Sequence, residues 1–494
     1  MGLNTLDLGI IAAYLAGVTL FGLRYRKHRR TLKDYFLADR QIPWWAIALS
    51  IVAAETSTLT VISVPGLAYD KDFRFLQLIF GYLIGRVLVS FLLIPHYFRG
   101  DLVTAYQLIE RRFGQKLHTL TAGMFLVTRS AAEGVRVFAV AIVVRVALGG
   151  LLTGMSDLQR DVCAIAVVTV LTLVYTFEGG MAAVIWTDVM QLAIYATGTV
   201  VAFFTILHAI PGGWPTVHSI AGNAGKLRVF DWSWRLADTY TFWSGIIGGT
   251  FLTTASHGTD QLIVQRLLAA RTERQSKIAL MTSGVIVFFQ FSLFLLIGAM
   301  LFVYYQFFPP AGGFARTDLI YPTFIVSRLP HGVSGLLISA ILAAAMCNLS
   351  AALNSLSSTS IVDFYGRIRP QSTESQRVQL SRIATVLWAV VLFGLAILAR
   401  HGGRVIEAGL SIASVAYGSL LGVFLLGPLT RTVSERGAIA GMVAGFAVNL
   451  YLWLCTDVSF PWYVVFGSIV TIVIGWSVSA AIPAEQHHPV ALRK

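Results

Sequence analysis

Stretches of about twenty apolar residues recur along the whole chain, and this pattern limits most strictly how the chain can fold. A helix needs roughly twenty such residues to cross the ~30 Å apolar core of a bilayer. Inside a bilayer the backbone must satisfy its own hydrogen bonds, so segments of this length are expected to be helical. The sequence therefore predicts an all-α polytopic membrane protein, a single transmembrane domain over residues 1–494 with about thirteen helices, at 6–23, 45–69, 75–97, 117–148, 160–177, 183–209, 241–264, 278–306, 334–362, 383–399, 405–427, 437–455 and 462–482.

The composition agrees with a membrane protein and excludes other classes. Hydrophobic residues make up 56% and charged residues 12% of the chain, whereas a soluble domain carries about 25% charged residues. Disorder is excluded as well, because it needs low hydrophobicity and high charge. The three cysteines lie far apart, at spacings that fit neither a zinc site nor a disulfide framework.

The net charge of +13 indicates topology and not a nucleic-acid partner, because most of the 37 Lys and Arg residues fall in loops predicted on one side of the membrane. The first helix has no basic residue before it and is followed by Arg24, Arg26 and Lys27, the reverse of a signal peptide. We therefore expect an uncleaved first helix, an N-terminus outside and a cytoplasmic C-terminus.

Two predicted helices have polar middles. Hydroxyl residues and Glu55 interrupt the second helix over 50–60, and hydroxyl residues, His257 and Asp260 interrupt the seventh over 248–261. Irregular backbone at membrane depth is tolerated only around a cavity, and paired broken helices are typical of secondary transporters built from inverted repeats. In the alternative, these hydroxyls bond only to carbonyls inside a packed bundle.

Three motifs resemble those of the sodium:solute symporter family, which includes sodium–glucose cotransporters, the proline permease and bacterial sialic acid symporters. They read VYTFEGGMAAVIWTDVMQ at 174–191, DQLIVQRLLAA at 260–270 and CNLSAALNSLSSTSIVDFY at 347–365. The resemblance runs from about residue 6 to 482. It implies a LeuT-like fold of 5+5 inverted repeats, with a first repeat at about 45–209, a second at about 241–427, and peripheral helices and tails at 1–44 and 428–494.

The resemblance also implies sodium as the coupling ion, with no other cofactor or metal. The family's common sodium site aligns with five positions here, namely Ala53, Thr56, Ala344, Cys347 and Asn348. The last two usually carry Ser or Thr, and sulfur is a poor ligand for a hard cation. The implied site is therefore altered, with hydroxyl, amide and backbone oxygens remaining as ligands.

Some members of the family have a second sodium site, built on the aspartate of the WTD sequence and three serines. Only Asp188 and Ser350 fit that pattern here, because Cys347 and Ala351 replace the other two serines. We expect this site to be weak or absent, with a stoichiometry nearer one sodium. Alternatively, Asp188 only satisfies polar groups at a helix end.

The resemblance places substrate contacts on both interrupted helices. They align with Glu55, Ser57 and Thr60 in the second helix and with Thr253, Ser256 and His257 in the seventh. The family's sugar carriers have large aromatic residues where Ser256 and His257 stand, and a carboxylate where this chain has Ile79. The usual set for glucose or galactose is therefore missing, although other polyols remain open.

The fourth helix carries Arg129, Glu133 and Arg136 on one face, at spacings of four and three residues. Charges within a bilayer cost roughly 3 kcal/mol or more and mark functional sites by default. The family's sialic acid carriers bind a carboxylate through an arginine in this helix, whose ungapped equivalent is Ala132. An anionic substrate bound bidentately by an arginine could balance the surplus guanidinium. Alternatively, the three residues form an internal network with Arg86 or Glu55.

These observations predict a sodium-coupled symporter that imports a small polar organic solute by alternating access, as a monomer in the bacterial inner membrane. A sialic acid or other carboxylate is the first expectation, and a sugar, polyol or amino acid the second. A desolvated Glu55 could carry a coupling proton, and His257 is a pocket donor or a proton relay.

An enzyme is not expected, because no nucleophile–base pair or phosphate loop occurs. A receptor would need a signalling domain, for which the tail after 482 is short, and a channel would need a continuous polar lining.

Overall fold

The computed structural model describes residues 3–24, 31–100, 102–148, 154–310, 313–314, 316–401, 405–430 and 432–481. No β-strand occurs in these ranges. The α-helices are α1 (Thr5–Leu23), α2 (Leu32–Leu37), α3 (Trp44–Glu55), α4 (Thr58–Asp70), α5 (Leu76–Leu92), α6 (Ile94–Phe98), α7 (Tyr106–Phe113), α8 (Gln115–Leu148), α9 (Asp157–Ala209), α10 (Gly213–Asn223), α11 (Gly249–Gly258), α12 (Gln261–Leu268), α13 (Glu273–Phe307), α14 (Ile320–Arg328), α15 (Val333–Thr359), α16 (Gly366–Ile368), α17 (Glu374–Leu398), α18 (Val405–Leu429), α19 (Glu435–Cys455) and α20 (Phe460–Ala481). Shorter turns are the 3-10 helices η1 (Ala38–Arg40), η3 (Thr317–Leu319) and η5 (Ala399–His401), and the π-helices η2 (Ser244–Gly248) and η4 (Ser360–Tyr365).

The predicted all-α membrane class is confirmed, and each predicted span coincides with a helix or an interrupted helix. By length and hydropathy, ten described helices can cross a membrane, or eleven if α3 and α4 are one bent span. The two further predicted spans fail this test for visible reasons. The helix α8 carries Arg129, Glu133 and Arg136 within its middle, and the segment from 244 to 268 is divided among η2, α11 and α12. Part of the charge bias from which the topology was predicted lies outside the described residues. This part comprises the basic residues within 25–30, those at 404 and 431, and the tail from 482.

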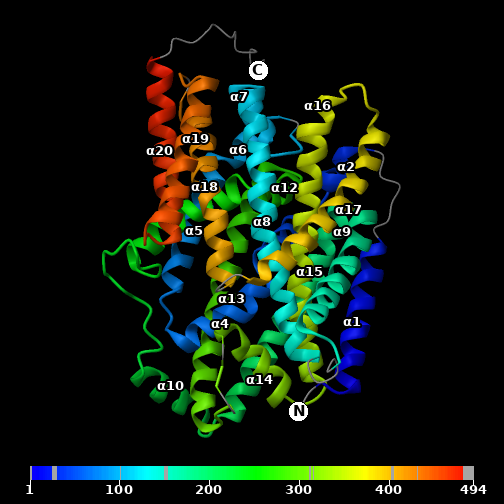
Figure 1. The fold of residues 1–494 in the computed structure, drawn as a ribbon, viewed down its shortest axis with the longest axis vertical. Helices are drawn as coiled ribbons and strands as arrows, with labels where there is room; N and C mark the ends of the chain where they lie inside the picture. The colour runs from blue at the N-terminus through cyan, green and yellow to red at the C-terminus, as the bar shows by residue number, and fades with distance from the viewer. Residues whose placement is uncertain are drawn as a thin grey trace.

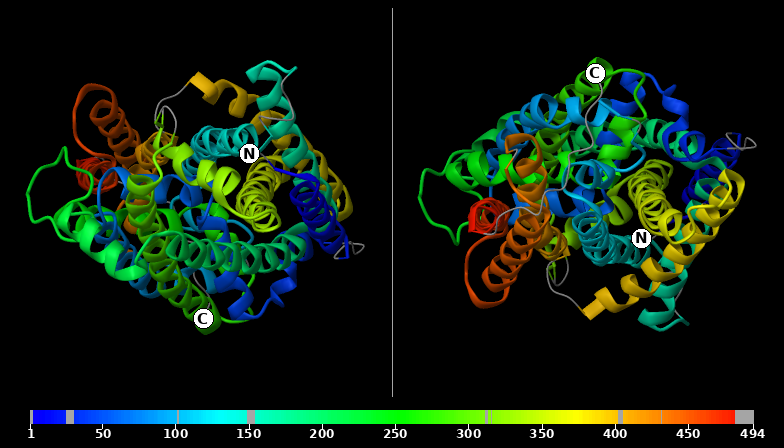
Figure 2. Two further views of the ribbon diagram at one scale, coloured as in Figure 1. Left: turned by 90° about the horizontal axis from the view of Figure 1, so that it is seen from below. Right: turned by 90° about the horizontal axis from the view of Figure 1, so that it is seen from above.

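The helices enclose a central helix, α15. In Figure 1, α1 lies on one flank of the bundle, and α19 and α20 lie on the opposite flank. The end-on views of Figure 2 show α15 (yellow-green) surrounded by other helices, and 94% of its apolar stretch is buried against 22% for α1. Its sequence is rich in Ala and Ser, and small residues let transmembrane helices approach closely.

The first interrupted helix is formed by α3 and α4, whose axes differ by 63°. Between them, Thr56 (φ −84°, ψ 94°) and Ser57 (φ −88°, ψ 169°) have extended backbone. The break leaves the last carbonyls of α3 and the first N–H groups of α4 without helical partners. It falls within the polar stretch from which the sequence predicted an interruption.

The second interrupted helix is formed by η2, α11 and α12. The helix α11 ends at Gly258, and Asp260 (φ −79°, ψ 122°) is extended before α12 begins. The carboxylate of Asp260 accepts a 2.9 Å hydrogen bond from the N–H of Leu262, which caps α12. Polar groups are thus exposed at both breaks in the interior of the bundle.

The fifth and sixth predicted spans correspond to two helices within α9, Asp157–Phe177 and Gly179–Ala209, which meet at a kink at Gly180 (φ 55°, ψ −152°). A side chain at this position would bring a Cβ within 2.5 Å of the carbonyl oxygen of Tyr35. Only glycine combines this backbone conformation with so close a contact. The bend fixes the start of the segment that carries Asp188.

Candidate functional site

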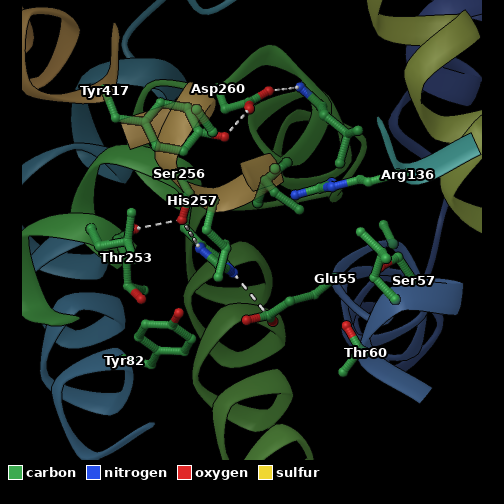
Figure 3. A pocket seen from close by; sticks show the side chains of 18 of the residues that line it. Glu55, Ser57, Thr60, Tyr82, Arg136, Thr253, Ser256, His257, Asp260 and Tyr417 are labelled. Carbon is green, nitrogen blue, oxygen red and sulfur yellow. Dashed lines mark hydrogen bonds and ion pairs between the residues drawn. The ribbon is translucent and has the colours of Figure 1, made fainter. Parts of the chain in front are cut away.

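A cavity of about 110 Å³ lies between the two helix breaks. All eight residues predicted to contact substrate line it, namely Glu55, Ser57, Thr60, Arg129, Arg136, Thr253, Ser256 and His257. In Figure 3 the residues of α3 and α4 face those of α11 across the cavity. The structure therefore brings together residues that are about 200 positions apart in the sequence.

Glu55, which lines the cavity, forms an ion pair with the buried Arg86 behind it. Arg86 Nη2 donates to Glu55 Oε2 in a short contact, and Arg86 is 1% exposed. His257 Nε2 lies 3.2 Å from Arg86 Nη2 and 3.5 Å from Glu55 Oε2, while its Nδ1 is 2.9 Å from the hydroxyl of Ser256. Glu55 is thus half of an ion pair and not an isolated carboxylate.

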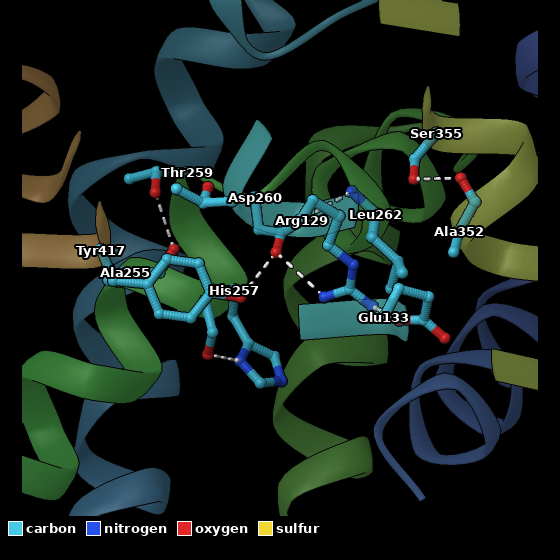
Figure 4. A network of polar contacts seen from close by, with 12 residues as sticks. Arg129, Glu133, Ala255, His257, Thr259, Asp260, Leu262, Ala352, Ser355 and Tyr417 are labelled. Carbon is cyan, nitrogen blue, oxygen red and sulfur yellow. Dashed lines mark hydrogen bonds and ion pairs between the residues drawn. The ribbon is translucent and has the colours of Figure 1, made fainter. Parts of the chain in front are cut away.

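A second polar network centres on Arg129. Its guanidinium donates to Glu133 at 2.9 Å and to Asp260 Oδ2 at 3.3 Å. The same Asp260 oxygen accepts a 2.6 Å hydrogen bond from the hydroxyl of Tyr417, and Figure 4 shows the carboxylate between these two donors. Because Asp260 also caps α12, its carboxylate links α8, α12 and α18.

The other arginine of α8, Arg136, has weaker partners. Its Nη1 lies 3.7 Å from Glu133 Oε2 and 3.5 Å from Asn348 Oδ1, and its side chain is 18% exposed to the cavity. The sequence left two interpretations open for these arginines, an internal network and a contact with an anionic substrate, and each interpretation fits one of the two. Arg129 belongs to the internal network, whereas Arg136 retains hydrogen-bonding capacity that faces the cavity.

The sequence did not predict three of the polar partners found near the cavity. They are Asp260, Tyr417 and Arg86, which the sequence offered only as an alternative partner and which the structure pairs with Glu55. Asp260 could have been found, because it was part of a recognised motif and stands at the second break. Tyr417 carried no signal, since it lies in an otherwise plain apolar helix.

The five positions predicted to bind sodium are all buried around the first break and the middle of α15. The hydroxyl of Thr58, on α4, donates to the carbonyl of Ile341, on α15, at 3.3 Å, so the two elements meet there. No side-chain hydrogen bond is available from Ala53 or Ala344, and only their backbone carbonyls can act as ligands.

The side chains at the other three positions have protein partners. The Cys347 thiol donates to Gln191 Oε1 at 2.9 Å, and the Asn348 amide donates to Glu133 Oε1 at 2.8 Å. Thr56 Oγ1 accepts a 2.8 Å hydrogen bond from Gln290. Gln290, on α13, is a neighbour of the first break that the sequence did not reveal.

The two residues proposed for a second sodium site also have partners. Asp188 Oδ2 accepts from Arg266 Nη2 at 2.9 Å and from the hydroxyl of Ser50 at 2.5 Å. The hydroxyl of Ser350 donates to the carbonyl of Cys347 at 2.9 Å. Arg266 belongs to a motif identified in the sequence, but its pairing with Asp188 was not predicted.

Comparisons with known proteins agree with this architecture. Residues 35–445 match the family model described as the sodium:solute symporter family. The chain is 28% identical to the sodium/sialic acid symporter NanT of Aliivibrio fischeri, over 96% of this chain and 92% of the relative. It is also 28% identical to the human sodium/iodide cotransporter, over 91% of this chain and 69% of the relative.

Solved structures show the same fold. A sodium-coupled sialic acid symporter in a substrate-bound, outward-open state superposes with a TM-score of 0.87 at 26% identity, over 97% of this chain and 98% of that one. Mhp1, a nucleobase-cation-symport-1 family transporter, has a TM-score of 0.56 at 14% identity, over 93% of this chain and 97% of that one. These similarities confirm the predicted LeuT-like class.

Proposed function

Because the chain belongs to the sodium:solute symporter family, we propose that its central cavity binds an organic carboxylate, which the protein imports together with sodium. The protein is an integral membrane transporter and not an enzyme, and sodium is its coupling ion. The named relatives carry sialic acid and iodide, which are both anions.

The observation that carries the substrate class is the position of Arg136. It lines the cavity, while its closest carboxylate oxygen is 3.7 Å away. An arginine binds a carboxylate through two parallel hydrogen bonds, a geometry that excludes most neutral solutes from an equivalent contact. We infer that the carboxylate of the substrate lies against Arg136.

Hydroxyl groups favour a polyhydroxylated carboxylate, such as a sialic acid. Ser57 and Thr60 on one wall and Thr253 and Ser256 on the other can bond to substrate hydroxyls. A sugar without a carboxylate is the second candidate, because the same hydroxyl groups would serve it. It would leave Arg136 without a strong partner.

Sodium is proposed to bind at the first break. The carbonyls freed between α3 and α4, at Ala53 and Thr56, and the carbonyl of Ala344 supply oxygen ligands of the type that hard cations prefer. Asn348 can contribute its amide oxygen if the side chain turns away from Glu133, whereas the Cys347 thiol is a poor ligand.

For transport we propose two inverted repeats, about 45–209 and 241–427, that move around the cavity. Alternating access in such transporters is largely a rocking of one bundle against another around a fixed site. The bias of basic residues supports an N-terminus outside, a cytoplasmic C-terminus and an inner-membrane location. A monomer is proposed as the transporting unit, because both breaks of one chain line the cavity.

Uptake by reconstituted protein tests the proposal. Labelled N-acetylneuraminate, L-lactate and glucose are offered to proteoliposomes under an inward sodium gradient or an equal potassium gradient. At least one carboxylate should accumulate, and only with sodium. Accumulation of glucose alone, or of a carboxylate equally well with potassium, would contradict the proposed function.

A further inference from the structure

We propose that residues 230–243, here called the aromatic segment, lie in the headgroup region of the membrane, where their exposed rings contact phospholipid. The segment belongs to the connection between α10 and η2 and lies outside the lining of the central cavity. The inference therefore does not depend on which solute is carried. Because the segment continues directly into η2, its contact with lipid fixes the depth at which the second interrupted helix begins.

The rings of the aromatic segment are exposed although they are large and apolar. Trp232 is 62% exposed, Trp234 60% and Phe230 44%. A contiguous apolar patch on a protein surface marks a site of contact with another protein or with a membrane. Trp in particular is enriched at membrane–water interfaces, because its ring is apolar while its N–H can bond to water or to headgroups.

The exposed rings form an ordered array. Ring contacts run from Phe230 through Trp232, Phe242 and Trp243 to Trp234, with centroid separations from 4.3 to 5.7 Å. Aromatic pairs of this kind contribute about 0.5–1.5 kcal/mol each beyond the area that they bury. The aromatic segment is therefore a continuous surface of rings that hold one another in place.

Hydrogen bonds fix the aromatic segment to the helix bundle on two sides. Asp231 Oδ2 accepts from Arg74 Nη1 at 2.7 Å, and the N–H of Asp231 donates to Gln77 Oε1, on α5, at 3.0 Å. On the other side, the N–H of Ser459 donates to the carbonyl of Leu236 at 2.8 Å. The segment is thus attached both beside the start of α5 and at the connection between α19 and α20.

The second attachment sets the depth of the aromatic segment. Ser459 lies between α19 and α20, which are both long and apolar enough to cross a membrane, so this connection marks the edge of the apolar core. The ring of Trp234 lies 6.0 Å from that of Trp462, in the first turn of α20. The aromatic segment therefore lies at the level where α20 enters the membrane, which the proposed orientation makes the outer leaflet.

The aromatic segment also lies at the periphery of the protein. In Figure 1 the long helices run vertically, and the connection between α10 and η2 (green) extends sideways past α20. Both views of Figure 2 show it projecting beyond the bundle. A segment that projects sideways at the level of a helix end lies over the surrounding lipid. Arg235, which is exposed within it, can bond to lipid phosphate and is attracted by anionic headgroups.

The depth of a spin label in the aromatic segment tests this inference. The exposed Cys163 and Cys455 are replaced by Ser, the buried Cys347 is kept, and Trp232→Cys carries the label. The full-length protein is reconstituted into vesicles of phosphatidylethanolamine and phosphatidylglycerol. Collision rates are then measured with oxygen, which concentrates in lipid, and with a water-soluble nickel chelate.

Two references calibrate these collision rates. A label on Leu454→Cys, a 65% exposed position on the spanning helix α19, represents the lipid side, and free label in the buffer represents water. The label at 232 should collide several-fold less often with the nickel chelate than the free label does. It should also collide more often with oxygen than the free label does.

Two results would overturn the inference. A label at 232 that meets the nickel chelate as often as the free label does would place the rings in water. A label that neither reagent reaches would show that a second copy of the chain covers them. If Trp232→Cys does not fold, Ala237→Cys, an exposed position that keeps every ring, is measured in its place. Neither substrate nor sodium is needed, so the result is independent of the proposed function.

Discussion

The amide of Asn348 donates a 2.8 Å hydrogen bond to Glu133, which joins the proposed sodium ligands of α15 to the charged face of α8. Glu133 also accepts from Arg129 and lies near Arg136. The carboxylate of Glu133 thus connects the proposed sodium position with Arg136, the proposed ligand of the substrate carboxylate. A sodium ion that draws the Asn348 amide oxygen towards itself would also change the environment of Arg136.

Replacing Asn348 should therefore alter the sodium dependence of uptake. Asn348→Ser restores a hydroxyl ligand and should lower the half-saturating sodium concentration, whereas Asn348→Ala should raise it about tenfold, the equivalent of ~1.4 kcal/mol. Initial uptake rates over a range of sodium concentrations measure both. An unchanged dependence in the folded variants would remove Asn348 from the sodium site.

Replacing Arg136 should abolish recognition of the carboxylate. Truncating one partner of a buried charged hydrogen bond costs about 2–5 kcal/mol, so Arg136→Met should raise the substrate KM by at least thirtyfold. Arg228→Met, at an arginine between α10 and η2 whose side chain is 58% exposed, serves as the control and should leave KM unchanged. Aggregation or a large loss of melting temperature in Arg136→Met would instead indicate a structural role.

The sequence was sufficient to predict the helices and both breaks, and its resemblance to the family pointed to eight of the residues that line the cavity, whose role as substrate contacts stays a prediction. These predictions succeed because a bilayer makes apolar length and buried polarity unambiguous signals. Of the hydroxyls at 56–60 and 253–256, Ser57, Thr60, Thr253 and Ser256 line the same cavity. Thr58 and Thr254 instead donate to backbone carbonyls, as the alternative interpretation expected.

The pairing of charges could not be predicted, because it depends on how each helix is rotated and on which helices are neighbours. Arg86 with Glu55, Asp260 with Arg129, and Arg266 with Asp188 each join residues more than thirty positions apart. In the sequence of α8, Glu133 is the single carboxylate that could pair with the guanidiniums of Arg129 and Arg136. The structure supplies Asp260 as another carboxylate, from a helix that no local pattern connects with α8.

Glu55→Gln should destabilise the protein more than it changes the pH dependence of uptake. Removing one partner of a buried ion pair costs about 3–5 kcal/mol, because the remaining charge stays buried. The variant should therefore unfold at a lower temperature, and Glu55→Gln combined with Arg86→Met should recover part of the loss. A stable Glu55→Gln protein that has lost a pH dependence seen in the wild type would instead support proton coupling through Glu55.

Asp231 should stabilise the loop between α10 and η2 at neutral pH. A backbone hydrogen bond from Ser233, followed by pairing with Arg74 at 2.7 Å, lowers the pKa of Asp231 to about 2. Because the folded-state pKa is depressed, this contribution is present above the ordinary pKa near 4 and is lost as the pH falls towards 2. Asp231→Asn should increase hydrogen exchange in residues 228–240 at pH 7, whereas Asp238→Asn, an exposed neighbour, should not.

Uptake should be electroneutral if the substrate is a monocarboxylate. The formal charges of Arg86, Arg129 and Arg136 cancel those of Glu55, Glu133 and Asp260, and Arg266 cancels Asp188. One sodium and one carboxylate then preserve neutrality in the interior, whereas a second sodium would leave a buried positive charge. A potential of 100 mV is worth about 2.3 kcal/mol for each elementary charge moved. Moving one net charge would thus shift the accumulation ratio about fiftyfold, and a valinomycin-clamped potassium potential in proteoliposomes should produce no such shift.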